Sequence, residues 1–166
     1  MSNTKKIVLS GILVAIAVVM SSFYIPIGVA KCFPIQHLIN VLAGVLLGPI
    51  YAVSVAFVTS LIRVLSGTGS LLAFPGSMCG ALLCGLLYKY TKNTSMAFLG
   101  EVFGTGVIGA LLAFPIATLF LSKTAALFAF VIPFGLSSLV GAAISVVFIT
   151  ALKKAGIFNK LILEGK

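Results

Sequence analysis

Long apolar runs, separated by short stretches of glycine, proline and polar residues, make up most of the chain. A helix that crosses a bilayer needs about 20 mainly apolar residues. Such runs, the second of them short, cover residues 7–25, 35–47, 50–65, 71–90, 96–121 and 125–152. Backbone groups in lipid must be hydrogen-bonded within the protein, which favours helices. The pattern therefore predicts an all-α polytopic membrane protein, with six transmembrane helices in a single membrane domain of residues 1–166.

Composition excludes a soluble globule. Hydrophobic residues make up 61% of the chain and charged residues 8%, and the mean hydropathy is +1.29. A typical soluble domain is about 45–50% apolar and about 25% charged. A chain of 166 residues has too little interior to hide so much apolar surface from water. Lipid around the helices removes this conflict, because outward-facing apolar side chains then cost nothing.

The charges predict an orientation in the membrane. The net charge of +9 comes from 11 Lys and Arg and 2 acidic residues, and most of the lysines lie between the apolar runs. With six spans, one side of the membrane holds Lys5, Lys6, Lys89, Lys92, Lys153, Lys154, Lys160 and Lys166. The other side holds Lys31, Arg63 and Lys123. Lys and Arg are in excess on the cytoplasmic side, so both termini and the tail of residues 153–166 are predicted to be cytoplasmic.

Polar residues inside the spans are functional candidates, because burying them in a membrane is costly. His37 and Asn40 lie three residues apart near the start of the second span, on one helix face, and Gln36 is adjacent. An imidazole and an amide both donate and accept hydrogen bonds, which suits a neutral polar heterocycle. Hydrogen bonding between helices without any ligand explains the same residues, and both interpretations stay open.

Arg63 lies near the outer end of the third span, just before a Gly-Thr-Gly loop. A long cationic side chain at this position commonly extends to the membrane surface. The alternative is that Arg63 faces a ligand cavity, because the loop that follows it lies on the same side of the membrane.

Glu101 is the one acidic residue within a predicted span, and Thr105 lies one turn further along. Three interpretations compete, namely a helix-start carboxylate favoured by the helix dipole, a proton relay, and the floor of a binding cavity. We favour the cavity, because a single acid with no second carboxylate or histidine on its helix is a poor proton path. Its depth, about one and a half turns from the cytoplasmic end, does not fit a site wholly at the outer surface.

Motifs of catalytic and nucleotide-binding sites are missing from the sequence. There is no GxxxxGK[ST] phosphate loop, no GxSxG and no HExxH. With no Asp and one His, general acid–base catalysis has few candidate residues. The three cysteines, Cys32, Cys79 and Cys84, show no metal-ligand spacing. We therefore predict no enzyme activity, no cofactor and no metal site.

Small residues recur four positions apart in several spans, a spacing that lets helix backbones approach closely. They are Gly11 and Ala15, Ala17 and Ser21, Ala52, Ala56 and Ser60, Gly76 and Gly80, and Gly100 and Gly104. Packing within the chain is the simpler interpretation, and a docking face for another subunit is the alternative.

Three stretches resemble the thiazole-precursor uptake family called ThiW. They are residues 33–49 (FPIQHLINVLAGVLLGP), 63–77 (RVLSGTGSLLAFPGS) and 100–110 (GEVFGTGVIGA). The resemblance covers nearly the whole chain and implies a substrate-capture (S) component of an energy-coupling factor (ECF) transporter. Such components are six-helix proteins of the bacterial cytoplasmic membrane with both termini cytoplasmic. They work with a transmembrane coupling subunit and two ATPase subunits, which agrees with the missing phosphate loop.

The resemblance also implies a ligand and a docking site. The expected ligand is the thiazole precursor of thiamine, hydroxyethylthiazole, captured outside the cell for ATP-driven uptake. Polar candidates for binding it are His37, Asn40, Arg63, Ser77, Glu101 and Thr105, and Phe33, Phe74 and Phe134 are candidates for packing its ring. In related S components the first helix docks on the coupling subunit through an Ala-x-x-x-Ala pattern. Gly11 and Ala15 form a near match here, with Gly in the first place.

Other functions fit parts of the pattern. The chain could be an S component for a different vitamin-like ligand. It could also be a stand-alone small secondary carrier or channel in which Glu101 is the proton or ion site. A purely structural membrane scaffold predicts no ligand, which leaves the polar residues within the spans unexplained.

Overall fold

The structure is a computed structural model that describes all residues except 28–29, 121–125, 159 and 161–166. Its elements are α1 (Asn3–Val19), the 3-10 turn η1 (Met20–Ser22), β1 (Ile25–Ile27), β2 (Ala30–Cys32), α2 (Pro34–Leu46), α3 (Pro49–Leu65), α4 (Ala73–Thr91), α5 (Thr94–Phe103), the π-helix η2 (Gly104–Gly109), α6 (Ala110–Phe120) and α7 (Val131–Lys154). The predicted loop at Lys123, the adjoining ends of two predicted spans and Lys166 lie outside the described residues.

The helices coincide with the six predicted apolar runs. Elements α5, η2 and α6 follow one another without a break and form one helical rod, Thr94–Phe120. Within the described residues, three helices are long and apolar enough to cross a membrane, namely Asn3–Ser22, Thr94–Phe120 and Val131–Lys154, while α2 and α3 are shorter. The prediction of an all-helical bundle is thus confirmed apart from a short hairpin, and the number of membrane crossings stays a prediction.

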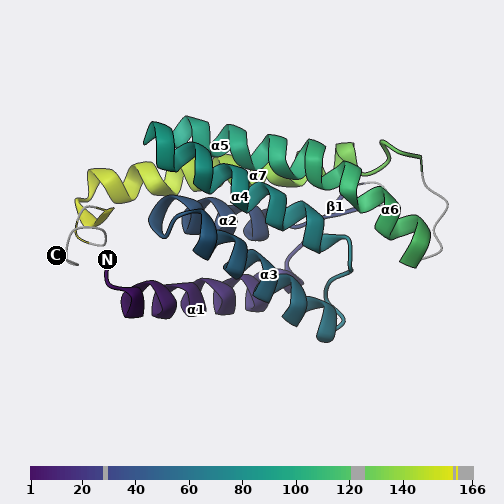
Figure 1. The fold of residues 1–166 in the computed structure, drawn as a ribbon, viewed down its shortest axis with the longest axis horizontal. Coiled ribbons are helices and arrows are strands. Elements are labelled where there is room, and N and C mark those ends of the chain that lie inside the picture. Colours follow the sequence, from purple (N-terminus) through teal and green to yellow (C-terminus); the bar gives the residue numbers. More distant parts are fainter. Residues whose placement is uncertain (28–29, 121–125, 159, 161–166) are drawn as a thin grey trace.

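With α5, η2 and α6 taken as one rod, successive helices run in opposite directions (Figure 1). The start of α1 and the end of α7 lie at the same end of the bundle. Helix α2 is central and contacts α1, α3, α4, α5 and α7. It buries residues on all its faces, apolar ones such as Val41 and Ala43 as well as the polar Asn40, which fits its central place. Helix α1 is peripheral, because only Leu13 and Ala17 of its residues are buried.

Glycines allow α4 to approach its neighbours closely. A Cβ atom added at Gly100 would lie 2.8 Å from the backbone of Leu83, and one at Gly104 would lie 2.7 Å from the Cys79 carbonyl oxygen. Real Cβ atoms do not come this close, so the contact of α4 with α5 and η2 depends on these glycines. The interpretation that such small-residue pairs pack within the chain is confirmed here.

The sequence pattern does not predict the hairpin that joins α1 to α2. Strands β1 and β2 pair antiparallel, with Ile25 opposite Cys32 and Pro26 opposite Lys31. The hairpin lies at the end of the bundle where α2 begins, and β2 contacts α7. Directly after it, the Phe33 backbone N–H donates to Ser137 Oγ at 2.8 Å. The hairpin therefore holds the start of α2 against α7.

Candidate functional site

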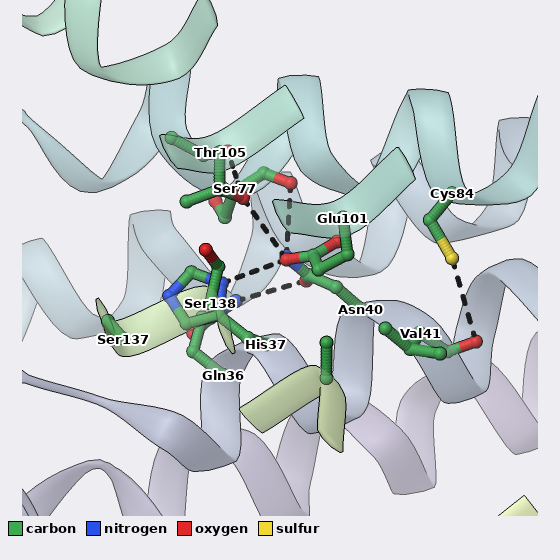
Figure 2. A network of polar contacts seen from close by, with 12 residues as sticks. Gln36, His37, Asn40, Val41, Ser77, Cys84, Glu101, Thr105, Ser137 and Ser138 are labelled. Carbon is green, nitrogen blue, oxygen red and sulfur yellow. Dashed lines mark hydrogen bonds and ion pairs between the residues drawn. The ribbon is translucent and has the colours of Figure 1, made fainter. Parts of the chain in front are cut away.

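Helix α2 begins inside the bundle, and this position sets the depth of its polar residues. Pro34 occupies the first turn, where a proline needs no hydrogen-bond partner and its fixed φ suits a helix. Gln36, His37 and Asn40 follow on the next turns, and all three are buried. They face Glu101 from α5, Thr105 from η2 and Ser77 from α4 (Figure 2).

Glu101 is the centre of this polar cluster. Its side chain is 0% exposed, and its Oε1 atom contacts three groups (Figure 2). His37 Nδ1 lies at 2.8 Å, Asn40 Nδ2 donates at 3.0 Å and Thr105 Oγ1 donates at 3.1 Å. Hydrogen bonds to an ionised acceptor are stronger than neutral ones, so this convergence favours a charged carboxylate.

A line of hydrogen bonds connects Glu101 to Arg63 through two amides. Arg63 Nη1 donates to Gln36 Oε1 at 3.1 Å, and Gln36 Nε2 donates to Asn40 Oδ1 at 3.5 Å. Asn40 Nδ2 then donates to Glu101 Oε1 and to the Ser77 carbonyl oxygen, the latter at 3.1 Å. A carbonyl oxygen only accepts hydrogen bonds, which fixes the orientation of the Asn40 amide. Every bond in the line therefore points from the guanidinium toward the carboxylate.

Arg63 is drawn into the bundle, so the interpretation that it extends to the membrane surface is wrong. The residue is 2% exposed, and its guanidinium lies over the Phe33 ring, 4.2 Å from the ring centroid. Its backbone oxygen accepts the N–H groups of Thr68 and Gly69, both at 2.9 Å. The Gly-Thr-Gly loop thus closes the end of α3, while the side chain turns inward to Gln36.

Close helix contacts leave no spare room around Glu101. A Cβ atom at Gly80 would lie 2.8 Å from both carboxylate oxygens and would overlap Thr105 Oγ1. On the opposite side, a Cβ atom at Gly141 of α7 would lie 2.8 Å from His37 Cβ and would overlap the Pro34 carbonyl oxygen. Helices α4 and α7 therefore pack tightly around the cluster.

The structure gathers most of the predicted site residues but not all of them. One hydrogen-bonded cluster contains His37, Asn40, Ser77, Glu101 and Thr105. Gln36 joins Arg63 to it, and the Phe33 ring packs against the Arg63 guanidinium. Phe74 lies one turn before Ser77 and packs against Phe57, with ring centroids 5.6 Å apart. Phe134 approaches α4 at Gly76, where an added Cβ would lie 2.9 Å from its ring.

Sequence reasoning missed several contributors to the cluster. Ser60 of α3 lies 3.0 Å from Ser77, oxygen to oxygen, and Gly80 makes room for the carboxylate. Both belong to the small-residue repeats, so spacing was the signal that marked them. Gln36 was noted as a neighbour of His37, but its role as a bridge to Arg63 depends on the inward turn of that arginine.

Gly11 and Ala15 differ from the other small-residue pairs. Both are exposed on α1, and a Cβ atom added at Gly11 meets nothing within 4 Å. The pairs on α3, α4 and α5 are buried against other helices of the chain. The packing explanation therefore does not account for Gly11 and Ala15.

The cluster offers hydrogen-bonding groups that are suited to binding a polar group. Among the described residues, no three His, Cys, Asp or Glu side chains come close enough to bind a metal ion. Three buried polar atoms in or near the cluster have no hydrogen-bond partner among the described residues, namely Thr59 Oγ1, Arg63 Nε and Glu101 Oε2. Two surface hollows, one along the first half of α1 and one beside Phe98 and Ala143, lie apart from the cluster.

Comparison with known proteins identifies a family for the chain. A family model described as "Thiamine-precursor transporter protein (ThiW)" matches residues 7–155, which is most of the chain. No curated protein and no solved structure matches the chain. The matched region contains every element of the bundle that contributes to the cluster. The chain therefore belongs to the ThiW family of thiamine-precursor transporter proteins.

Proposed function

We propose that the chain is the substrate-binding membrane subunit of an ECF-type transporter. It captures hydroxyethylthiazole outside the cell, and partner subunits drive uptake with ATP. The observation that carries this proposal is the buried polar cluster around Glu101, which lies within a bundle of apolar helices in a thiamine-precursor transporter family. A transporter of this family has no need of the catalytic residues that the sequence lacks.

The proposed topology has six membrane crossings with both termini in the cytoplasm of a bacterial cell. The alternating helix directions and the shared end for the start of α1 and the end of α7 support an even number of crossings. The lysine distribution supports the cytoplasmic side for that end. Helix α2, with 13 residues, is about 20 Å long and cannot cross a hydrocarbon core of about 30 Å alone. The hairpin completes that crossing.

The recessed start of α2 accounts for the depth of the proposed binding site. Glu101 lies about 10 Å along the rod that begins at Thr94, well below the outer surface. His37 contacts Glu101 directly, so the beginning of α2 lies at the same depth. A ligand that enters from outside therefore reaches the cluster through the region of the hairpin and the loop after α3.

The chemistry of the cluster suits a small heterocycle with one polar arm. The Phe33 ring beside Arg63 offers an apolar face, and the amide, hydroxyl and imidazole groups offer hydrogen bonds. Because these groups bond to one another in the structure, a ligand must replace some of these bonds with its own. A buried donor or acceptor left without a partner by the wrong ligand costs about 1–3 kcal/mol, which provides selectivity.

The exposed face of α1 is the proposed docking site for the transmembrane coupling subunit. Gly11 and Ala15 lie on it among exposed apolar side chains, including Ile7, Ile12 and Ile16. Small residues four apart allow two helix backbones to approach closely in a membrane. Among the described residues, both positions stay exposed and no other helix covers them, which supports a partner helix at this position.

Uptake of labelled hydroxyethylthiazole is expected to require the chain, the coupling subunit and both ATPase subunits together. The measurement compares cells that produce the chain alone, the partner subunits alone, and all of them. Uptake is predicted only in the third case, and it is predicted to stop when the ATPase subunits carry inactivating substitutions. Uptake by the chain alone, driven by an ion gradient, would show instead a stand-alone carrier.

A further inference from the structure

His37 of the cluster is the one histidine of the protein, and its two ring nitrogens have different surroundings. Its Nδ1 atom lies 2.8 Å from Glu101 Oε1, whereas Nε2 has no protein partner in the described part of the chain. The His37 side chain is 9% exposed and the Glu101 side chain 0%. Of these two groups, the imidazole is therefore the one that a ligand can reach.

The hydrogen bonds around Glu101 determine where the imidazole proton lies. Oε1 accepts a hydrogen bond from Asn40 Nδ2, so it is an acceptor in this cluster. The one hydrogen of Thr105 Oγ1 is shared between Oε1 and the Gly76 carbonyl oxygen, each at 3.1 Å. The buried Arg63 guanidinium, joined to Glu101 through Gln36 and Asn40, would be costly without a compensating negative charge, and an ionised Glu101 supplies that charge. The carboxylate is therefore ionised, and His37 Nδ1 carries the hydrogen that it donates to Oε1.

The charge balance of the cluster favours a neutral imidazole. Arg63 carries one positive charge and Glu101 one negative charge, and Gln36 and Asn40 connect them. Both charged residues are almost wholly buried. A protonated His37 would add a positive charge with no further anion among the described residues, which is costly inside a membrane. With Nδ1 protonated and the ring neutral, Nε2 is a hydrogen-bond acceptor.

Glu101 itself is shielded from a ligand. Its Oε1 atom is surrounded by three protein groups, and its Oε2 atom lies against α4 at Gly80, where an added Cβ would be 2.8 Å away. The carboxylate thus faces the protein on both oxygens.

We propose that Glu101 is a positioning residue that holds His37 as the neutral Nδ1–H tautomer, so that Nε2 accepts a hydrogen bond from the ligand. The ligand class is a small neutral ring that bears an O–H or N–H donor, and for hydroxyethylthiazole the donor is the hydroxyl group. This inference rests on the proposed function for the identity of the ligand. The tautomer, in contrast, is a property of the free protein.

The single histidine makes the tautomer directly measurable by nitrogen NMR. Purified protein labelled with ¹⁵N in its histidine ring, in detergent at neutral pH, is expected to show a protonated Nδ1 and an unprotonated Nε2. Addition of hydroxyethylthiazole is expected to shift the Nε2 resonance as it gains a hydrogen bond. An Nε2–H tautomer or a doubly protonated ring in the free protein would overturn the inference, whether or not any thiazole binds.

A matched pair of ligands tests the hydroxyl contact. The second compound carries a plain ethyl arm in place of the hydroxyethyl arm, so it cannot donate to Nε2. It is expected to bind roughly 5- to 100-fold more weakly than hydroxyethylthiazole, because Nε2 then lacks a partner. Equal affinities would overturn the hydroxyl contact and leave the proposed function standing. Failure of both compounds to bind would instead remove the proposed function, and the NMR spectrum would still decide the tautomer.

The variant His37→Asn separates the two ring nitrogens. The Asn amide retains a donor near the Nδ1 position for Glu101 and has nothing at the Nε2 position. It is expected to fold and to bind both thiazoles with the same weak affinity. The control Ser145→Ala removes a buried hydroxyl that bonds to the Ala142 carbonyl of its own helix, and should keep the full preference. Retention of the preference by His37→Asn would contradict the assignment of Nε2.

Discussion

The variant Glu101→Ala is expected to lose thiazole binding and to unfold much more readily than the wild type. The substitution removes the acceptor shared by His37, Asn40 and Thr105, all buried inside the bundle. Each buried group left without its hydrogen-bond partner costs about 1–3 kcal/mol of folding free energy, because it keeps its desolvation penalty. Thermal unfolding in detergent measures the loss of stability, and calorimetry at a temperature where the variant is folded measures the loss of binding.

Glu101→Gln is the matched control, because its amide oxygen can still accept from the three donors. We expect its loss of stability to be clearly smaller than that of the alanine variant. The amide oxygen is a neutral acceptor, whose hydrogen bonds are weaker than those of a carboxylate, so some loss remains. An alanine variant that unfolds at the wild-type temperature would show that the cluster around Glu101 does not stabilise the bundle as described.

Leucine at both Gly11 and Ala15 is expected to abolish uptake by the complete transporter and to leave thiazole binding by the purified chain unchanged. Both positions are exposed on α1 and belong to no part of the cluster, and a Cβ atom added at Gly11 meets no described atom within 4 Å. They would separate α1 from a partner helix that needs close backbone contact. The measurement pairs labelled uptake with calorimetry on the same variant.

Ala143→Leu is the control for this substitution, since Ala143 is an exposed small residue on α7, away from α1. It should leave both uptake and binding unchanged. Normal uptake by the Gly11 and Ala15 variant would remove α1 as the docking helix. Loss of binding together with uptake would show that the effect lies in the fold of the chain.

The fold could be predicted from sequence where one apolar run corresponds to one helix. The break at Gly48-Pro49 and the polar link at 92–95 mark real helix ends. The π-helix at Gly104–Gly109 could not be predicted, because its geometry depends on close packing of Gly104 against Cys79 and of Gly109 against Gly76. Short strands such as β1 and β2 leave no periodic pattern in a segment that contains proline.

The candidate site could be predicted residue by residue but not as an arrangement. Polar residues in apolar runs are conspicuous, which is why His37, Asn40 and Glu101 were identified. The sequence could not predict that these three side chains contact one another. Its pattern places the start of each span at the membrane surface, whereas α2 begins inside the bundle. The inward turn of Arg63 likewise depends on the Phe33 ring and on Gln36, which are tertiary contacts.

Calorimetry on the purified chain in detergent tests the central claim, that this single subunit binds the thiazole precursor, most directly. Hydroxyethylthiazole is titrated into the folded protein, with thiamine and its pyrimidine half as controls. We predict saturable binding of the thiazole and no comparable binding of the other two compounds. A folded sample that binds none of the three, or that prefers thiamine or the pyrimidine, would contradict the thiazole assignment.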